Sequence, residues 1–181
     1  MNNLILRDSN LKDIDDYIDW YTVNTEWKDY DAPWEKDEEI NLEKIKQCII
    51  KEVQNPPKIK THFEIESKEG KHIGRVSSYY INGNKEKLAV GIDIISKENR
   101  GKGLGYEALL KFIKYVLSNI TNEVYTETWS GNERMIKLAL KLGFEEINRE
   151  VDLLEVNGKY YDSITFKLNK EIFNELYKFV I

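Results

Sequence analysis

Cysteine is almost missing from this sequence, which holds one, Cys48, among 181 residues. A single cysteine excludes an internal disulfide framework and a metal site built from several thiolates. Apolar residues surround it at helical spacing: Leu42, Ile45, Ile49 and Val53. We therefore predict that Cys48 fills part of the core and is not a reactive thiol. His62 and His72 fall on separate predicted strands with no cysteine nearby, and we interpret both as structural or surface residues.

Long apolar runs and an excess of positive charge are also missing. No stretch approaches the roughly 20 apolar residues that a membrane-spanning helix needs. The first residues, MNNLILRDSNLKD, lack the apolar centre of a signal peptide. The net charge of -5 gives no electrostatic footprint for nucleic acid and mildly favours a cationic partner. We therefore expect a cytoplasmic protein that binds neither nucleic acid nor a membrane.

The hydrophobic periodicity predicts one domain over residues 1–181, in which strands and helices mix. Apolar residues recur at helical spacing over 11–23, 38–54, 104–118, 132–143 and 170–180. Strands are predicted at 3–10, 59–67, 72–81, 87–95, 123–129, 144–156 and 160–169, with Asn-Gly turns at 82–83 and 157–158. An aromatic loop, residues 24–37, separates the first two helices. Because hairpins and strand–helix–strand units both occur, we expect an α/β fold (α+β) with a mixed sheet.

Three glycines, Gly101, Gly103 and Gly105, stand between a predicted strand and a predicted helix. The last of them is followed by Tyr-Glu, which excludes a Walker A loop, and the spacing is a poor match to a dinucleotide fingerprint. Two interpretations stay open. The glycines form a tight turn, or their bare amides at the helix start bind an anion beside Arg100 and Lys102.

The strand before these glycines has two different faces. Its bulky side chains share one side and suit a core: Leu88, Val90, Ile92 and Ile94. The other side carries mostly small residues and one acid: Ala89, Gly91, Asp93 and Ile95. The small side leaves room for a ligand against the sheet, which favours the anion-site interpretation.

Two segments resemble signatures of the GCN5-related N-acetyltransferases, the GNAT family. The stretch ENRGKGLGYEALLKFI carries the pattern (Q/R)xxGx(G/A) at residues 100–105. The stretch WSGNERMIKLALKLGFEE is similar to the later signature, in which an asparagine opens a helix that ends in Gly-Phe. The predicted order of elements is similar to the family's over essentially the whole chain. The resemblance implies the GNAT fold, a mixed, mostly antiparallel seven-stranded sheet flanked by helices, here with a short extra C-terminal helix.

The resemblance implies an acetyl-CoA-dependent N-acetyltransferase, with acetyl-CoA as co-substrate and no metal. The diphosphate of coenzyme A would lie on the amides of one loop: Arg100, Gly101, Lys102, Gly103, Leu104 and Gly105. The pantetheine arm would pair with Ile94 and Ile95, and an amide near Ile95 would polarise the thioester carbonyl. Asn132 would contact coenzyme A, cap its own helix, or do both.

Transfer to an amine implies a carboxylate that accepts a proton. Asp93 is the first candidate, and its alternative role is to bind a cationic substrate. Glu127 on the next strand is the second candidate, with an acceptor-side position or a rim salt bridge as its alternatives. Many relatives carry a tyrosine, as the acid for the leaving thiolate, at the position of Ala139. The general acid therefore stays unassigned, and the same departure favours the RimJ/RimL-type branch of the family.

The resemblance also implies that the aromatic loop covers the acceptor side. There Trp27, Tyr30, Asp31 and Trp34 would make an acidic aromatic rim for a cation, although both tryptophans could simply fasten the loop. The acceptor stays open between a protein N-terminus, a polyamine and another small amine. An aminoglycoside is the further substrate, because GIDIISKENRGKGLG faintly resembles the aminoglycoside 6′-N-acetyltransferases. A non-catalytic acyl-CoA-binding module is the alternative from another class, and relatives are often homodimers.

Overall fold

A seven-stranded sheet forms the centre of the computed structural model, which describes residues 3–35 and 39–178. The strand order is β1-β2-β3-β4-β5-β7-β6, and β4 and β5 run parallel while the other neighbours are antiparallel. The strands are Leu4–Arg7 (β1), His62–Ser67 (β2), His72–Tyr80 (β3), Leu88–Ile94 (β4), Tyr125–Trp129 (β5), Phe144–Val156 (β6) and Lys159–Leu168 (β7). The expected mixed, mostly antiparallel sheet is confirmed.

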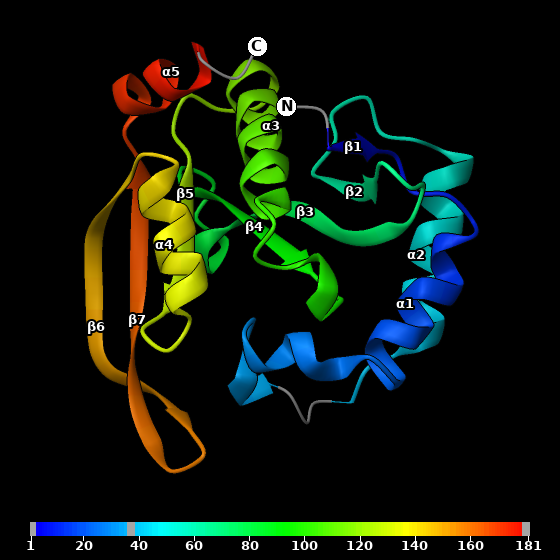
Figure 1. Ribbon diagram of the computed structural model, residues 1–181, viewed down its shortest axis with the longest axis horizontal. Helices are drawn as coiled ribbons and strands as arrows, with labels where there is room; N and C mark the ends of the chain where they lie inside the picture. Colours follow the sequence, from blue (N-terminus) through cyan, green and yellow to red (C-terminus); the bar gives the residue numbers. More distant parts are fainter. Residues whose placement is uncertain (1–2, 36–38, 179–181) are drawn as a thin grey trace.

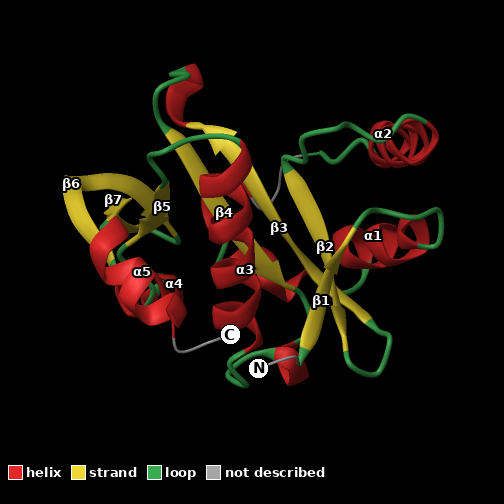
Figure 2. Cartoon of the chain, turned by 90° about the horizontal axis from the view of Figure 1, so that it is seen from above, coloured by secondary structure: helices red, strands yellow, loops and turns green. Residues whose placement is uncertain are grey.

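Helices cover both faces of this sheet. They are Asp13–Thr22 (α1), Leu42–Gln54 (α2), Leu104–Asn119 (α3), Glu133–Lys141 (α4) and Lys170–Lys178 (α5). In Figures 1 and 2, α1 and α2 lie on one face, and α3 and α4 lie on the other. Two 3-10 turns, Thr25–Asp29 (η1) and Pro33–Glu35 (η2), follow α1. The predicted order of elements is confirmed, although α2 begins at Leu42, after its cap Asn41, and the predicted start at 38 lies outside the described residues.

The main core lies between α3 and the bulky face of the sheet. Leu88 and Val90 of β4 are buried there, as the alternation predicts. The inward side chains of α3 are fully buried against them: Ala108, Leu109, Phe112 and Ile113. Burying a side chain the size of Leu or Phe contributes roughly 1.5–3 kcal/mol, so the packing of α3 stabilises β4.

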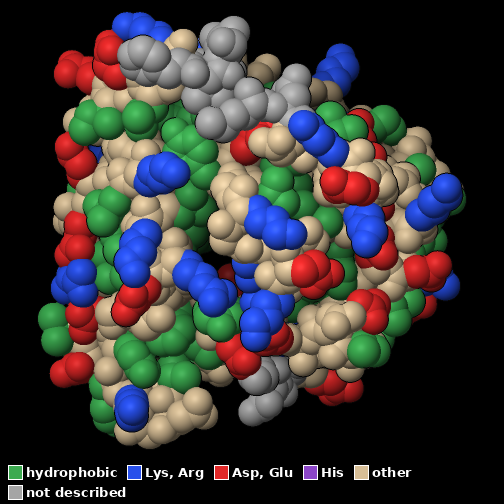
Figure 3. Space-filling view, viewed as in Figure 1, with side chains coloured by type: hydrophobic (Ala, Val, Ile, Leu, Met, Phe, Trp, Pro, Cys, Tyr) green, Lys and Arg blue, Asp and Glu red, His purple; other side chains and the backbone are tan. Residues whose placement is uncertain are grey.

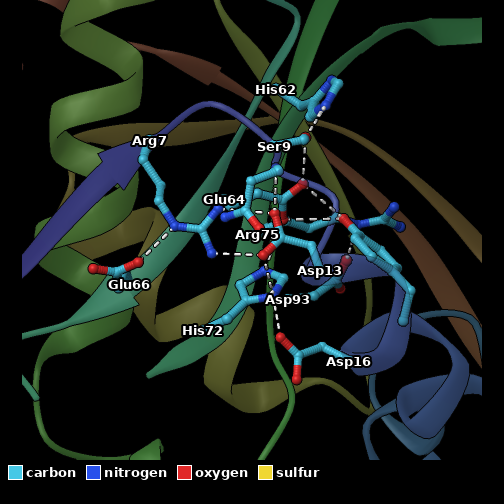
Figure 4. Close-up of polar contacts among 12 residues, drawn as sticks. Arg7, Ser9, Asp13, Asp16, His62, Glu64, Glu66, His72, Arg75 and Asp93 are labelled. Carbon is cyan, nitrogen blue, oxygen red and sulfur yellow. Dashed lines mark hydrogen bonds and ion pairs between the residues drawn. The ribbon is translucent and has the colours of Figure 1, made fainter. Parts of the chain in front are cut away.

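An ionic network fixes α1 to the opposite face of the sheet (Figure 4). Arg7 of β1 grips the buried carboxylate of Asp13 with two hydrogen bonds of 2.8 and 2.7 Å. His72 of β3 lies between Glu64, at 2.9 Å, and Asp16, at 3.0 Å. Burial alone would lower the pKa of His72, but the contact with Glu64 raises it. The buried imidazole thus has a carboxylate at each ring nitrogen, which confirms the structural interpretation of His72.

A bulge in β3 brings the charged residues of this network to one face. Ile65 pairs with Gly74 and the next residue, Glu66, pairs with His72, so the partner strand skips one residue. Beyond the bulge, Glu64 pairs with Arg75. His72 and Arg75 therefore share the α1 face, which a strict two-residue alternation would forbid.

The prediction that Cys48 is buried was wrong, because its side chain is exposed. Among the residues of α2, Ile49 is the one that is buried, and it packs with Tyr17 and Trp20 of α1. Cys48 instead borders a smaller cavity of about 320 Å³ between α2 and the sheet. His62 also borders it and pairs with Glu52 at 2.9 Å. Within residues 3–35 and 39–178, no helix is long and apolar enough to cross a membrane.

The ionic network predicts a strong effect of removing His72. His72→Gln should lower the free energy of unfolding by about 3–5 kcal/mol at pH 6, because Glu64 is 1% exposed and would lose its cation. Because folding raises the pKa of His72, this stabilisation is fully present below pH 6.5, the pKa of the residue in the unfolded chain. The stabilisation is lost as the pH rises through the pKa of His72 in the folded protein. Urea unfolding at pH 6 and pH 9 measures both effects.

Lys137→Gln is the matched control for this prediction. Lys137 forms an ion pair with Glu133 in which both side chains are 74% exposed, so its loss should cost under about 0.5 kcal/mol. Equal costs for the two variants at pH 6 would contradict the role given to His72.

Candidate functional site

The parallel strands β4 and β5 part soon after they meet. Ala89 pairs with Tyr125, and the Thr126 hydroxyl then donates to the carbonyl of Val90 at 2.8 Å. Beyond this link, β4 stays with β3 and β5 stays with β7. The separation opens a cleft of about 730 Å³ through the sheet. The two halves stand apart in Figure 1, and Figure 3 shows a hollow between them.

The three-glycine loop forms one wall of the cleft. Gly101 and Gly103 have positive φ angles of 74° and 80°, which side chains rarely adopt. No atom lies within 4 Å of a Cβ built on either glycine. The amides of residues 101–106 donate no hydrogen bond to another described residue, and the last three open α3. The glycines therefore make a tight turn, and that turn presents the bare amides that the anion-site interpretation requires.

The edge of β4 presents further backbone groups to the cleft. The amide of Ile95 donates to the carbonyl of Ile73 at 3.1 Å. Since antiparallel residues bond alternately to one side and the other, the backbone groups of Ile92 and Ile94 face the cleft. The amide of Ile95 is thus held by the sheet, so the expected thioester donor near Ile95 cannot be the Ile95 amide itself. The available amides belong to Ile92 and Ile94.

Arg100 ties the glycine loop to β4 and to η1. Its Nε donates to the carbonyl of Ile94 at 2.8 Å, and an Nη donates to the carbonyl of Ile95. Its other Nη lies 3.4 Å from the Glu26 carboxylate. Its guanidinium lies 5.4 Å from the centre of the Tyr30 ring. The residue thus fixes the loop at the cleft mouth and joins it to the segment after α1.

The carbonyl of Tyr30 is anchored on the opposite wall. Trp129 Nε1 donates to it at 3.0 Å, and Asn132 Nδ2 donates to it at 2.7 Å. The ring also packs 4.6 Å from the Arg134 guanidinium. Asn132 Oδ1 accepts from the amide of Met135 at 3.0 Å, which confirms the predicted helix cap. The segment around Tyr30 therefore bridges the cleft from the β4 side to α4.

The two tryptophans of the aromatic loop differ in position. Trp27 is buried, donates from Nε1 to the carbonyl of Trp20 at 2.9 Å, and lines the cleft with Tyr30 and Asp31. Trp34 is 40% exposed and packs edge-on to Trp129, with ring centres 6.2 Å apart. Trp27 thus fastens the loop, and Trp34 lies outside the lining of the cleft as the structure describes it.

Three carboxylates line the cleft on the α1 side: Asp31, Asp93 and Glu127. Asp93 forms an ion pair with Arg75 Nε at 3.1 Å (Figure 4). Burial raises the pKa of Glu127, and a hydrogen bond with the Tyr79 hydroxyl partly offsets this. Burial and the nearby charge of Asp93 raise the pKa of Asp31 to about 7. Sequence reasoning missed Arg75 and Tyr79, because only the β3–β4 pairing places them opposite Asp93 and Ala89.

Positive side chains gather on the other side of the cleft. They come from the loop after β4 and from α4: Lys97, Arg100, Arg134, Lys137 and Lys141. In Figure 3, Lys and Arg side chains surround the hollow on this face. The cleft is therefore charged oppositely at its two ends, with cations and bare amides toward α3 and α4 and carboxylates toward α1.

Ala139, at the position where many GNAT relatives carry a tyrosine, is fully buried in the core. Outside the cleft, Asp13, Asp16 and His72 lie close enough together to hold a cation. Arg7 and the imidazole already neutralise these carboxylates, so the chemistry of the group does not call for a metal.

The free amides on the loop after β4 lie where the first sequence signature predicts them. The model of the acetyltransferase (GNAT) domain matches residues 3–145. The chain belongs to the GNAT acetyltransferase family. The expected RimJ/RimL-type resemblance agrees with YdaF of Bacillus subtilis, provisionally named a ribosomal N-acetyltransferase, which is 30% identical over 103 residues. These cover 56% of this chain and 56% of YdaF.

A second relative is similar over a shorter stretch. The uncharacterised SPbeta prophage-derived N-acetyltransferase YokL of Bacillus subtilis is 32% identical over 75 residues, or 41% of this chain and 42% of YokL. The chain thus spans about half the length of the curated relatives it matches.

Solved structures of low identity share the fold. A spermidine N-acetyltransferase from Vibrio cholerae in complex with CoA and spermine has a TM-score of 0.74 at 20% identity, over 96% of this chain and 99% of that one. A GNAT-family acetyltransferase from Bacillus anthracis has a TM-score of 0.72 at 14% identity, over 94% and 96% of the two chains. These likenesses confirm the predicted GNAT fold.

The double role of Asn132 predicts two separable effects of its removal. Asn132→Ala should lower the free energy of unfolding by about 1–2 kcal/mol through the lost cap. It should also speed hydrogen exchange in residues 25–31, because Tyr30 loses a tether. Asn41→Ala is the matched control, since Asn41 caps α2 by the same bond, to the Lys44 amide at 2.9 Å. Faster exchange at 25–31 in both variants, or in neither, would contradict the tether.

Proposed function

We propose that this chain is an acetyl-CoA-dependent N-acetyltransferase that transfers an acetyl group to a primary amine by direct attack on the thioester. The observation that carries the proposal is the cleft through the split sheet, with anion-binding groups at one end and carboxylates at the other. An anionic donor and a cationic acceptor would each meet an end of opposite charge. Their reacting groups would meet where β4 and β5 part.

The donor side fits the diphosphate of coenzyme A. The amides of residues 101–105 stand at the positive end of the α3 dipole, with open space above Gly101 and Gly103. The amide of Arg100, which the sequence also predicts as a donor, is instead bonded to the carbonyl of Lys97 at 3.1 Å. Lys102 and the cations of α4 add charge. Family members use acetyl-CoA, and a Cβ at either glycine would enter the space that a diphosphate needs. Asn132 stands across the cleft, where its contact with coenzyme A would come in addition to its cap.

The thioester would lie along the edge of β4. The amides of Ile92 and Ile94 face the cleft, and either would stabilise the negative charge that develops on the thioester oxygen. The pantetheine arm would pair with the same edge, where Arg100 occupies the carbonyl of Ile94. Pairing at that carbonyl therefore requires the Arg100 side chain to shift.

The acceptor side fits a cationic amine. Three carboxylates face one guanidinium, Arg75, so the lining carries a negative surplus that attracts an ammonium group. Trp27 and Tyr30 add aromatic surface beside it. A protein N-terminus, a polyamine or another small amine meets this description. The solved spermidine N-acetyltransferase of the same fold makes a polyamine the first acceptor to test.

Thiol release from acetyl-CoA, measured with a panel of polyamines, peptides and aminoglycosides, tests the function. We expect turnover with at least one cationic amine and acetyl-CoA binding by calorimetry. Binding without turnover on any amine would contradict the enzyme and favour a non-catalytic module. No heat with any acyl-coenzyme A would contradict the donor site itself.

The glycine loop makes a separate prediction about acetyl-CoA. Gly103→Ala should raise the dissociation constant about tenfold or more, because the new Cβ fills the open space and strains the left-handed backbone. Gly70→Ala is the control, since Gly70 has a φ of 74° and open space too, but lies in the β2–β3 turn. Both variants should lose about 1–2 kcal/mol of stability. Equal acetyl-CoA affinity in both would contradict the loop's role.

A further inference from the structure

We propose that Asp31, on the segment that bridges the cleft, accepts the proton that the bound ammonium loses before its nitrogen attacks the thioester. The inference rests on the proposed acetyl transfer and assigns a step within it. The sequence favours Asp93 and Glu127 for this role. The contacts of the three carboxylates distinguish them.

The backbone holds Asp31 firmly at the cleft. Its amide donates to the carbonyl of Trp27 at 3.2 Å. The preceding carbonyl, that of Tyr30, accepts from Trp129 and Asn132 on the far wall. Asp31 lines the cleft, and part of the residue's surface is exposed to solvent. A small ligand in the cleft can therefore reach a carboxylate whose backbone is held by hydrogen bonds on both sides.

The other two carboxylates already have partners. Asp93 forms the ion pair with Arg75, and a proton on Asp93 would sacrifice that pair in a confined site. Glu127 shares a hydrogen bond with the Tyr79 hydroxyl. The Asp31 carboxylate makes no hydrogen bond or ion pair with another described residue. Proton uptake by Asp31 thus breaks no contact in the described part of the chain.

The charged and titratable groups around Asp31 favour proton uptake near neutral pH. They come from β4, β3, α1 and its own loop: Asp93, Arg75, Tyr79, Tyr21 and Glu35. Burial raises the pKa of Asp31 first, the charges of Asp93 and Glu35 raise it further, and Arg75 lowers it, with a result of about 7. A base with a pKa near the working pH combines ionisation with proton affinity.

The proposed step conserves every atom and charge. One N–H bond of the ammonium breaks, and its proton joins the Asp31 carboxylate, which leaves a neutral amine with a free electron pair. That pair forms the C–N bond at the thioester carbonyl, and the C–S bond breaks with its electrons on sulfur. The second proton of the nitrogen passes to the thiolate through solvent, giving the N-substituted acetamide and free coenzyme A. Asp31 then returns its proton to water.

The experiment compares Asp31→Asn with wild-type enzyme across pH 5–10, using acetyl-CoA and the best amine of the panel. We expect the wild-type kcat/KM to fall below about pH 7, where Asp31 becomes protonated, since this ratio reports groups of the free enzyme. Asp31→Asn should lower kcat by about 100-fold or more and abolish that acid limb. Asp93→Asn should move the limb to lower pH, because the charge of Asp93 raises the pKa of Asp31.

Two measurements separate this role from a structural one. Glu39→Gln, at an exposed acid shortly before α2, should keep the wild-type profile. Asp31→Asn should raise Tm at pH 8 and leave it nearly unchanged at pH 4. Tm should rise at pH 8 because a carboxyl group whose pKa is raised by folding destabilises the fold when it is ionised, and the substitution removes that cost. The cost is absent below 3.8, the pKa of the carboxyl group in the unfolded chain.

The outcomes separate failure of this inference from failure of the acetyl transfer. Suppose that the wild-type enzyme turns over, and that Asp31→Asn keeps its kcat within about threefold of wild type and also keeps the acid limb. This result would overturn the role of Asp31 and leave the acetyl transfer standing. A carboxyl carbon signal of Asp31 that titrates near pH 4 in NMR would overturn it whether or not turnover occurs. No turnover by wild-type enzyme on any amine would overturn the acetyl transfer, and the proton step with it.

Discussion

The separation of β4 from β5 is the constraint on which the rest of the site depends. The two strands share the Ala89–Tyr125 pairing and the Thr126 hydroxyl bond to Val90, and each then follows its antiparallel neighbour. Parallel strands that stayed paired would satisfy the backbone groups of Ile92 and Ile94 within the sheet. Because they part, these groups face a cavity, and the turn that follows β4 brings the first amides of α3 to the same place. The cleft therefore exists because pairing stops.

The separated strands need support from elsewhere, and long-range polar contacts supply it. On one side, α3 holds β4 by packing, while Arg100 binds the carbonyls at the end of the strand. Across the mouth, the carbonyl of Tyr30 accepts two hydrogen bonds from the far wall. On the α1 face, the network around His72 and Glu64 anchors the helix that leads into this bridging segment. The elements that shape the cleft are thus joined to one another on both faces.

Much of this arrangement follows from local sequence. Apolar periodicity predicts the order of strands and helices, and the glycines at 101 and 103 have the left-handed conformation that explains their identity. Asn132 caps α4, as its place before the helix predicts. The rest depends on contacts between distant segments. Period-two alternation misplaces His72 relative to Arg75, because it cannot foresee the β3 bulge. The exposure of Cys48 and the bond that engages the Ile95 amide likewise depend on which neighbours the fold supplies.

The central claim is that the free amides beside the separated strands bind the diphosphate of acetyl-CoA. NMR can observe those amides directly. Titration of 15N-labelled protein with acetyl-CoA should produce its largest amide shifts in residues 101–106, with a second group at Ile92 and Ile94. The β2–β3 turn around Gly70 should stay unchanged. Saturating acetyl-CoA that leaves the amides of residues 101–106 at their free positions, or that shifts residues elsewhere instead, would contradict the account.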